Sequence, residues 1–464
     1  MNRFFASLLG LWLGSAAMVS AGTPMSFWVW NHPGALPPSE RESLRKADVA
    51  RLYWHVADLH WEKGAWKPGG EISAPLRVEG LEVVPVFRLH AEAASASGDF
   101  ETLGRQLASY LGQFGISQVQ IDYDCSDASL ARYAEGLQRC REKLRPAQLT
   151  ATALAGWIDR KAFPALERAV DGLFPMFYDL EPDTPAAVRE GRFAPIANLS
   201  QNLEFLKRWR RCSVPWTAGL PCFSRLSLFA PGGELLGHVR TWDWDSVIFN
   251  PAFRLQTASA DFTHLRVLAD VRFGQTAIHR GEQLVARETA PRDLALLAKA
   301  AAEAGAAGVI WFRLPDGSPQ TSVSIGMLRT LVDGAVPAPR LHLSWDSKGR
   351  LLLANDGPAD LLPRIAGRFG VEDRGWQLEV EADRAGAFQG ASAGEFVQVL
   401  GFRDVDGERP VRVSLDQAQR LTFWFGSLPG GESLRTGVIP LDKPGHSESK
   451  WRWRVDGESW RSFD

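Results

Sequence analysis

Hydrophobic and polar positions follow a repeating order of strand and helix along most of the chain. Eight short runs rich in β-branched and aromatic residues have the length and composition of strands. These runs cover residues 27–31, 50–56, 81–89, 119–125, 148–154, 173–179, 214–223 and 308–314. Most are separated by segments whose apolar residues recur every three or four positions, as in amphipathic helices. The alternation predicts an α/β fold, a (β/α)8 TIM barrel with its ligand chemistry at the carboxyl ends of the strands.

Two connections depart from this order. The sequence DLHWEKGAWKPGG, which follows the second predicted strand, has the pattern of a hairpin. Between the seventh and eighth strands, residues 224–305 hold far more than one helix and include short β-like runs. We expect this longer segment to be an insertion over the mouth of the barrel.

The pattern changes again after residues 334–340. Six short alternating runs between residues 342 and 426 are separated by Gly, Asn, Asp and Pro and show little helical periodicity. They predict a C-terminal all-β sandwich. The tail KWRWRVDGESWRSF can form a final strand, an exposed arm or a partner-binding segment. The predicted division is a signal peptide over 1–21, a barrel over 22–336, with the insertion at about 224–305, and a β-sandwich with its tail over 337–464.

The first residues are typical of an export signal. Arg3 is followed by an apolar run over residues 4–13 and by small residues before Gly22. The apolar run is too short to span a bilayer, and no later stretch is long and apolar enough to anchor the chain. We therefore predict a periplasmic or secreted protein without a membrane span.

Composition narrows the class of partner. The chain has 464 residues and a net charge of -2, whereas nucleic-acid-binding proteins usually carry a basic surplus, so no nucleic acid is predicted. The 18 Trp against 5 Tyr favour contact with flat ligands such as sugar rings, although a large core also uses Trp. The sequence does not specify an oligomeric state. Export allows disulfides, and both pairing and free buried thiols stay open for Cys125, Cys140, Cys212 and Cys222.

The segment QVQIDYDC, residues 118–125, places two carboxylates at the end of the fourth predicted strand. Because alternate side chains of a strand share a face, Gln120, Asp122 and Asp124 point to one side and the apolar residues between them to the other. In a barrel mouth of low dielectric, one carboxylate raises the pKa of its neighbour, so that one of the two stays protonated near neutral pH. Asp124, nearer the end of the strand, is the predicted general acid, and Asp122 orients and tunes it.

Four motifs, in the expected order, resemble those of chitinase-like, family eighteen glycoside hydrolases. IDYD at 121–124 is similar to their IDWE-type signature, and FPMFYD at 174–179 is similar to their sixth-strand Met-x-Tyr-Asp. GLPCFSR at 219–225 resembles their Gly-x-Pro-x-Tyr-Gly-Arg run, and GVIWFRL carries Trp311 where that superfamily places a pocket Trp. The barrel is also similar to secreted bacterial barrel proteins of unassigned function.

The resemblance implies cleavage of a glycosidic bond in a cell-envelope or extracellular polysaccharide, with an amino-sugar polymer as one candidate. Asp124, Asp122, Tyr178 and Asp179 are the implied catalytic residues. In that chemistry the N-acetyl group of the substrate attacks the anomeric carbon, and Tyr178 and Asp179 position it. For a sugar without this group, Asp179 or Asp122 would supply the second carboxylate.

Four positions depart from the family pattern. Phe223 and Ser224 replace the Tyr and Gly of the run at the seventh strand. Asp124 stands where the family has its catalytic glutamate, and Gln120 stands where it has its first aspartate. An acid one methylene shorter can misplace its proton by about 1 Å, which can cost on the order of 100-fold in rate.

Polar and aromatic residues at other strand ends are predicted to contact the substrate. Arg88 and His90 share a face of the third strand, and Arg313 shares one with Trp311. The substrate-binding candidates are Gln120, Trp311, Arg313, Arg88, His90, Trp54 and Met176. No cofactor is predicted, and no metal, because no HxxxH or HExxH spacing is present.

Two other functions fit the sequence. The first is a barrel that binds an oligosaccharide or polysaccharide without cleaving it, which the departures at Asp124 and Gln120 favour. The second is a metal-dependent polysaccharide deacetylase that uses His55, His60 and His90 with the two aspartates.

Overall fold

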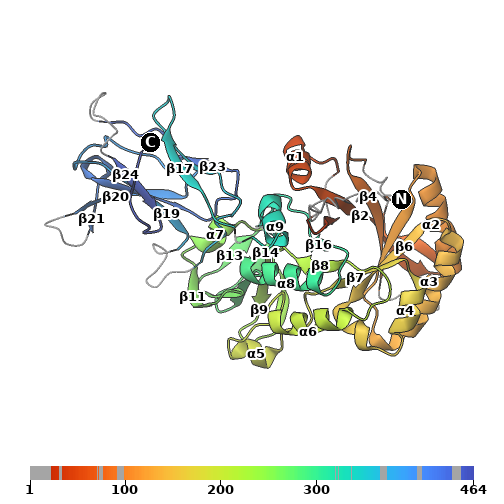
Figure 1. Cartoon of the computed structure of the whole chain (residues 1–464). Helices are drawn as coiled ribbons and strands as arrows, with labels where there is room; N and C mark the ends of the chain where they lie inside the picture. Colours follow the sequence, from red (N-terminus) through yellow and green to blue (C-terminus); the bar gives the residue numbers. More distant parts are fainter. Residues whose placement is uncertain are drawn as a thin grey trace, which may run out of the picture.

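The computed structural model describes most of the chain. The described residues are 22–30, 34–70, 72, 77–90, 99–318, 320–321, 323–335, 337–365, 374–404, 410–441 and 451–463. The predicted signal peptide, residues 1–21, lies outside them. Figure 1 shows a barrel surrounded by helices at one end of the molecule and β-sheets from the C-terminal part of the chain at the other.

Eight parallel strands in the described part of the chain close into a barrel, which confirms the predicted fold class. Each strand pairs with its neighbour around the ring, and the last strand pairs with the first. The strands are β1 (Met25–Val29), β2 (Val49–Glu62), β4 (Glu82–Leu89), β5 (Gln118–Asp122), β6 (Gln148–Leu154), β7 (Gly172–Met176), β8 (Ala218–Pro221) and β16 (Val309–Phe312). Each of them overlaps one of the eight runs identified in the sequence.

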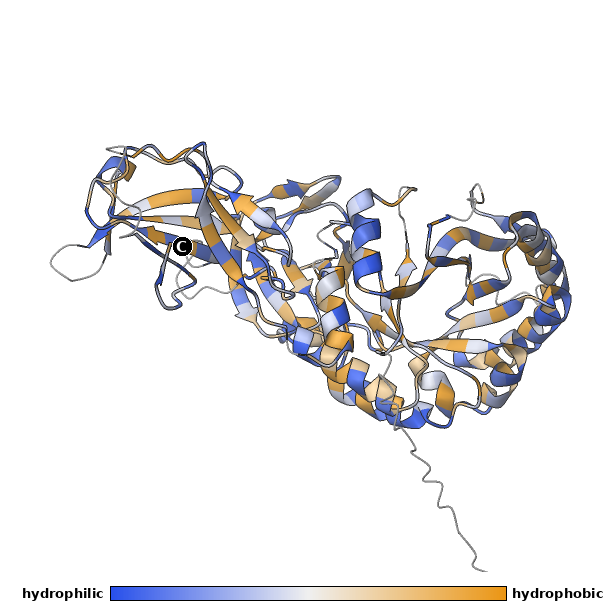
Figure 2. Cartoon of the chain, turned by 45° about the horizontal axis from the view of Figure 1, so that its top comes forward, coloured by the Kyte–Doolittle hydropathy of each residue, from blue (hydrophilic) through white to orange (hydrophobic). Residues whose placement is uncertain are grey.

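Amphipathic helices cover the outside of the barrel. In α2 (Phe100–Phe114) the buried residues Leu103, Leu107 and Leu111 recur every four positions and face the strands. Figure 2 shows the same banding of hydrophobic and hydrophilic residues on the surrounding helices. These helices are α1 (Pro38–Lys46), α3 (Leu130–Leu144), α4 (Phe163–Ala169), α6 (Leu199–Trp209), α8 (Pro291–Glu303) and α9 (Ile325–Val332), with a short α5 (Pro185–Arg189) after β7.

The hairpin predicted after the second strand is present. Strand β2 continues to Glu62 and pairs antiparallel with β3 (Ala65–Pro68). The two residues between them, Lys63 and Gly64, both have positive φ, 51° and 79°, which is the backbone of a tight two-residue hairpin turn. The hairpin therefore lies in the connection from β2 to β4, where a helix would normally link two barrel strands.

The insertion between β8 and β16 is a small β-structure of its own. Among the described residues it contains a five-stranded antiparallel sheet and a two-stranded ribbon. Its elements are β9 (Arg225–Phe229), β10 (Leu235–His238), α7 (Trp244–Ile248), β11 (Phe253–Ala258), β12 (Phe262–Val267), β13 (Val271–Phe273), β14 (Thr276–Ile278) and β15 (Gln283–Arg287). Strand β9 starts at the mouth, but most of the insertion lies between the barrel and the C-terminal sheets (Figure 1). It therefore borders the mouth on one side, where we had expected a cover.

The C-terminal part of the chain forms two sheets around a common apolar core, as the predicted β-sandwich requires. Within the described residues, one sheet holds β17 (Leu341–Trp345), β18 (Leu351–Asn355) and β23 (Ser433–Arg435). The other holds β19 (Trp376–Glu381), β20 (Gln398–Asp404), β21 (Pro410–Val413), β22 (Arg420–Phe425), β24 (Arg452–Val455) and β25 (Arg461–Ser462). The tail therefore supplies the final hairpin of this sheet, which settles the three alternatives in favour of a strand.

Polar contacts between described residues join the sandwich to the rest of the molecule. The buried guanidinium of Arg374 donates to the carbonyl oxygens of Ile248 and Phe253 in the insertion, at 3.0 and 2.7 Å. The carboxylate of Asp360 accepts from the backbone N–H of Ser324, which precedes α9, at 2.6 Å. Because these groups are buried or half-buried, the contacts fix the sandwich against both the insertion and the barrel.

Two sequence expectations concern the chain as a whole. The four cysteines are all described, and all are free thiols, so the alternative of unpaired cysteines is the correct one. Within the described ranges, no helix combines the length and the apolar character needed to cross a bilayer.

Candidate active site at the mouth of the barrel

A pocket of about 220 Å³ opens at the carboxyl end of the barrel strands. This is the end at which barrels of this kind carry ligand chemistry. The residues that line it are Trp28, Trp30, Arg88, Asp122, Asp124, Thr152, Met176, Tyr178, Asp179 and Phe312. Six of the residues predicted for the site, including all four predicted catalytic residues, therefore meet in one cavity.

Asp122 is the deeper of the two strand-five carboxylates. It points into the barrel, is 9% exposed and accepts a hydrogen bond from the Thr152 hydroxyl at 2.7 Å. The Arg88 guanidinium lies 3.8 Å from its second oxygen. Burial and the charge of Asp124 together raise the pKa of Asp122 to about 6, against the lowering effect of Thr152 and Arg88.

Asp124 lies just beyond the end of β5, at the rim of the same pocket. The residue is exposed, yet the surrounding pocket walls withdraw water from its carboxyl group and raise its pKa, while Arg88 lowers it. One carboxylate is thus buried beside a positive charge and its neighbour is open to a ligand. This is the arrangement in which two acids can share one proton.

Tyr178 and Asp179 enter the pocket from the segment that follows β7. The Tyr178 ring stacks on Phe312, with centroids 5.7 Å apart, and burial with the charges of the nearby aspartates raises its pKa well above the usual value. Asp179 has a φ of 52°, a left-handed conformation that few residues other than Gly adopt. Its carboxylate forms an ion pair with Arg225 of β9, so the insertion holds one of the pocket residues in place.

The floor of the pocket depends on Trp28. Its indole N–H donates to the side-chain oxygen of Gln120 at 2.7 Å, and both residues are buried. A Cβ atom at Gly219 would lie 2.7 Å from the Trp28 ring, so only Gly leaves room for the indole at this position. Gln120 therefore supports the floor from below, where the sequence had predicted a substrate contact.

The placement of two predicted tryptophans was wrong. Trp311 is 0% exposed and Trp54 is 6% exposed, and both pack in the core between strands and helices. Their neighbours in sequence, including Phe312, point into the barrel instead. Side chains alternate across a strand, so a residue one position from an inward-facing one must face outward.

Arg313 and His90 lie near the pocket without lining it. Arg313 donates to the backbone oxygen of Trp30 at 3.3 Å and pairs with Asp316 at 2.9 Å, so it braces the rim. His90 stacks on His60, with ring centroids 4.1 Å apart. Both residues stay candidates for contact with a longer substrate.

The histidines beside the mouth do not support the deacetylase alternative. His55 and His90 each approach one oxygen of Asp58, at 3.3 and 3.6 Å. Nevertheless, in the part of the chain that the structure describes, no group of three or more His, Cys, Asp or Glu is arranged to hold a metal ion. The ligand set that a catalytic zinc needs is therefore not present there.

The strand pattern missed four pocket residues, namely Trp28, Trp30, Thr152 and Phe312. Trp28 and Trp30 alternate on the first strand in the same way as the aspartates on the fourth. A signal was therefore present in FWVWN, but neither face of that run is polar enough to identify the inward one.

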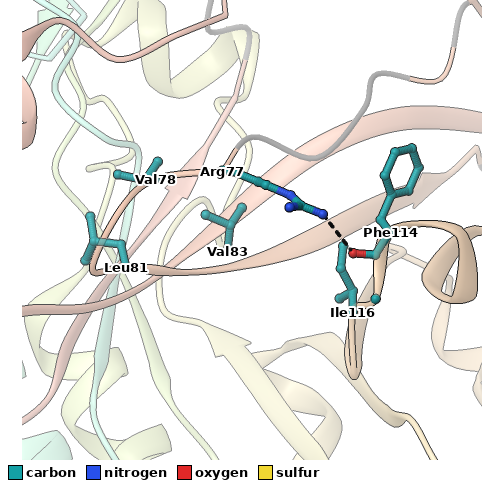
Figure 3. Close-up of a pocket in the computed structure, with 7 residues that line it drawn as sticks. Arg77, Val78, Leu81, Val83, Phe114 and Ile116 are labelled. Atoms are coloured by element: carbon teal, nitrogen blue, oxygen red, sulfur yellow. Dashed lines mark hydrogen bonds between the residues drawn. The ribbon is translucent and has the colours of Figure 1, made fainter.

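Another pocket, of about 360 Å³, lies at the opposite end of the barrel strands. Figure 3 shows the Arg77 side chain there, reaching the backbone oxygen of Phe114 at the end of α2. Its other walls are aliphatic, with Val78, Leu81 and Val83 among them. Residues at this end of such barrels serve stability, so we do not consider it a reaction site.

Comparison with known proteins gives a family model and a set of solved structures. The model of a domain of unknown function (DUF3142) matches residues 99–233, less than a third of the chain but a range that includes all four predicted catalytic residues. No curated protein is significantly similar to the chain.

Chitinases and other enzymes are among the similar solved structures. The spore cortex-lytic enzyme SleL of Bacillus megaterium QM B1551 has 11% identity and a TM-score of 0.45, over 68% of this chain and 74% of that one. The C-terminal domain of a putative chitinase from Desulfitobacterium hafniense DCB-2 has 12% identity and a TM-score of 0.48, over 67% and 99%. A glycoside hydrolase family 18 N-acetylglucosaminidase from Paenibacillus barengoltzii has 15% identity and a TM-score of 0.44, over 67% and 99%.

These proteins are of the kind that the four sequence motifs resemble. The TM-scores are all below 0.5. The fold itself is therefore assigned from the strand order of this structure.

Proposed function

We propose that the chain is an exported glycoside hydrolase that cleaves a glycosidic bond in a cell-envelope or extracellular polysaccharide built from amino sugars. The observation that carries the proposal is that Asp122 and Asp124 share one pocket with Tyr178, in a cavity on the scale of a single sugar ring. Export would use residues 1–21.

Asp124 serves as the general acid because it is the member of the pair that a ligand can reach. Asp122, buried behind it, has its pKa raised to about 6, so the pair holds one proton below about pH 6 and keeps a decreasing share of it toward neutral pH. Transfer of this proton to the glycosidic oxygen lets the bond to the anomeric carbon break. Asp122 then carries the negative charge that favours reprotonation of the pair.

The second half of the reaction uses the substrate. The carbonyl oxygen of a 2-acetamido group bonds to the anomeric carbon as the leaving group departs, with the Tyr178 hydroxyl and Asp179 holding that group. Water then adds to the anomeric carbon, the acetamido oxygen is released, and the proton from water returns to Asp124. Arg225 supports this role by pairing with the Asp179 carboxylate and fixing its position.

Binding without cleavage is the second candidate. Asp124 is one methylene shorter than a glutamate, so its proton lies about 1 Å farther from a bound glycosidic oxygen. A barrel of this kind would hold the sugar against Trp28 and Phe312 and release no product.

The Asp124→Asn variant separates the two functions. Purified protein is incubated with a panel of amino-sugar polymers, and released reducing ends and affinity are both measured. For a hydrolase, the variant loses at least about 100-fold in turnover while affinity changes by less than about 3-fold. The matched control is Asp127→Asn, an exposed aspartate that pairs with Arg160 beyond the pocket and whose loss leaves turnover unchanged. Binding without product in wild type and variant alike would establish the binding function instead.

A further inference from the structure

A cleft of about 730 Å³ lies between the insertion and the C-terminal sandwich, away from the barrel mouth. The insertion supplies residues 241–243, 245–246, 249–251 and 272–274 to its walls, and the sandwich supplies Val397. Figure 1 shows α7 and β13 of the insertion next to the C-terminal sheets. The two parts are held together there by Arg374, so the cleft has fixed walls.

Trp242 in this cleft carries an unsatisfied polar group. The residue is only 6% exposed, and its indole N–H has no hydrogen-bond partner among the described residues. A buried donor without an acceptor costs about 1 to 3 kcal/mol. Because Trp242 lines the cleft, a ligand bound there can supply the missing acceptor.

The other walls combine aromatic rings with polar groups held in place. Phe249 is half-buried and Phe273 is buried. The Asp243 carboxylate accepts from the backbone N–H and the hydroxyl of Ser246, at 2.7 and 2.6 Å, while Asp245 accepts from the backbone N–H of Gly426. Each carboxylate keeps free lone pairs for a ligand hydroxyl.

This combination suits a neutral oligosaccharide. Sugar rings present apolar C–H faces that pack on aromatic side chains, and their hydroxyls pair with carboxylates and with donors such as the indole N–H. The exposed Arg272 adds a further donor at the rim. We propose that the cleft between the insertion and the sandwich is a second glycan-binding site, which holds a segment of the polymer outside the mouth.

The loop after β16 connects the cleft with the mouth. On one side Arg313 donates to the backbone oxygen of Trp30, which lines the mouth pocket. On the other side the Gln320 amide donates to the backbone oxygen of Arg240 at 2.9 Å, two residues before Trp242. Contacts of this loop therefore reach residues that belong to, or lie next to, both sites.

The test uses Val397→Trp to fill the cleft. Val397 is 39% exposed, and its matched control is Val411→Trp, at a position of the same sandwich that is 49% exposed and lies outside the cleft. The probe is a hexamer of β-1,4-linked N-acetylglucosamine, titrated by calorimetry into full-length protein that carries Asp124→Asn to prevent turnover. We expect two binding sites, one of which weakens by at least 10-fold in the Val397 variant and neither of which changes in the Val411 variant.

A second measurement reports on Trp242 itself. Its indole N–H signal, assigned through Trp242→Phe, is expected to shift in the nitrogen-proton NMR spectrum when the hexamer is added. A purely structural tryptophan would show no such shift. Equal binding by the Val397 and Val411 variants would overturn the inference, and so would an unshifted signal.

The inference rests on the proposed function for the choice of probe, and the outcomes separate the two. Hydrolysis with no effect of Val397→Trp on binding would overturn the second site alone. Binding that is sensitive to Val397→Trp without hydrolysis by wild type would overturn the hydrolase alone and support the second site. Neither binding nor hydrolysis of the hexamer would overturn both for this class of sugar.

Discussion

Substitution of Asp122 by Asn tests the electrostatics at the centre of the site. Burial and the neighbouring charge of Asp124 raise the pKa of Asp122 from 3.8 to about 6 in the folded protein. The folded state therefore holds this proton more tightly than the unfolded chain does. The free energy of unfolding contributed by this group is highest below pH 3.8, falls as the pH rises toward 6, and is constant above it.

The size of the effect follows from the pKa. A change in pKa from 3.8 to about 6 means that the free energy of unfolding falls by about 3 kcal/mol between low and high pH. Asn does not ionise and keeps an oxygen that accepts from the Thr152 hydroxyl. At high pH the variant therefore avoids this loss of stability. Part of that benefit is offset because Asn no longer attracts Arg88, which is about half exposed. We expect Asp122→Asn to be about 2 kcal/mol more stable than wild type at pH 8, and equally stable below pH 4, with hydrolysis lost.

Urea unfolding at pH 4, 6 and 8 measures this difference. The barrel and the sandwich can unfold separately, so hydrogen exchange of β5 amides assigns the transition that belongs to the barrel. The control is Glu142→Gln, the same carboxyl-to-amide change at an exposed position of α3, which should alter stability by less than about 0.5 kcal/mol at each pH. A variant that is less stable at pH 8, or one whose gain is the same at pH 4 and pH 8, would refute the account of a desolvated acid.

Two further substitutions follow from the same charges. Arg88→Gln removes the cation 3.8 Å from Asp122, so the pKa of Asp122 rises further. We expect the pH profile of kcat/KM to move to higher pH by about half a unit to one unit. A profile that does not move, or that moves to lower pH, would contradict this. Asp183 contacts the buried guanidinium of Arg287 at 2.7 Å, so Asp183→Ala leaves that guanidinium without its charge partner. The free energy of unfolding, measured in urea, should fall by about 3 to 5 kcal/mol. A loss below about 1 kcal/mol would show that water compensates the charge.

A site residue could be predicted only where the sequence of its strand shows which of the two faces points into the barrel. On the fourth predicted strand, Gln120 and Asp122 are polar and their neighbours are apolar, so one face was identifiable. The run GVIWFRL is apolar on both faces, as parallel strands covered on both sides commonly are. Nothing in that run says whether Trp311 or Phe312 points inward, and the expectation for Trp311 was wrong for this reason.

The site also depends on contacts between distant segments. Trp28 rests on Gln120, 92 residues away, and Asp179 pairs with Arg225, 46 residues away. No local pattern encodes such partners, because they follow from how eight strands close and where the insertion leaves the ring. The cleft beside Trp242 depends on residues that lie still farther apart in the sequence, because one of its walls belongs to the C-terminal sandwich.

By itself the sequence determined the elements: eight barrel strands, a hairpin after the second, an inserted β-structure, a β-sandwich, and an acid pair at the end of the fourth strand. These follow from local periodicity, which side-chain alternation and helical spacing impose on short segments. The tertiary structure alone decided which aromatic residues form the pocket, that Gln120 supports it from below, and that the insertion stands beside the mouth. Those features depend on ring closure and on packing between segments far apart in the chain, and short-range patterns carry no information about either.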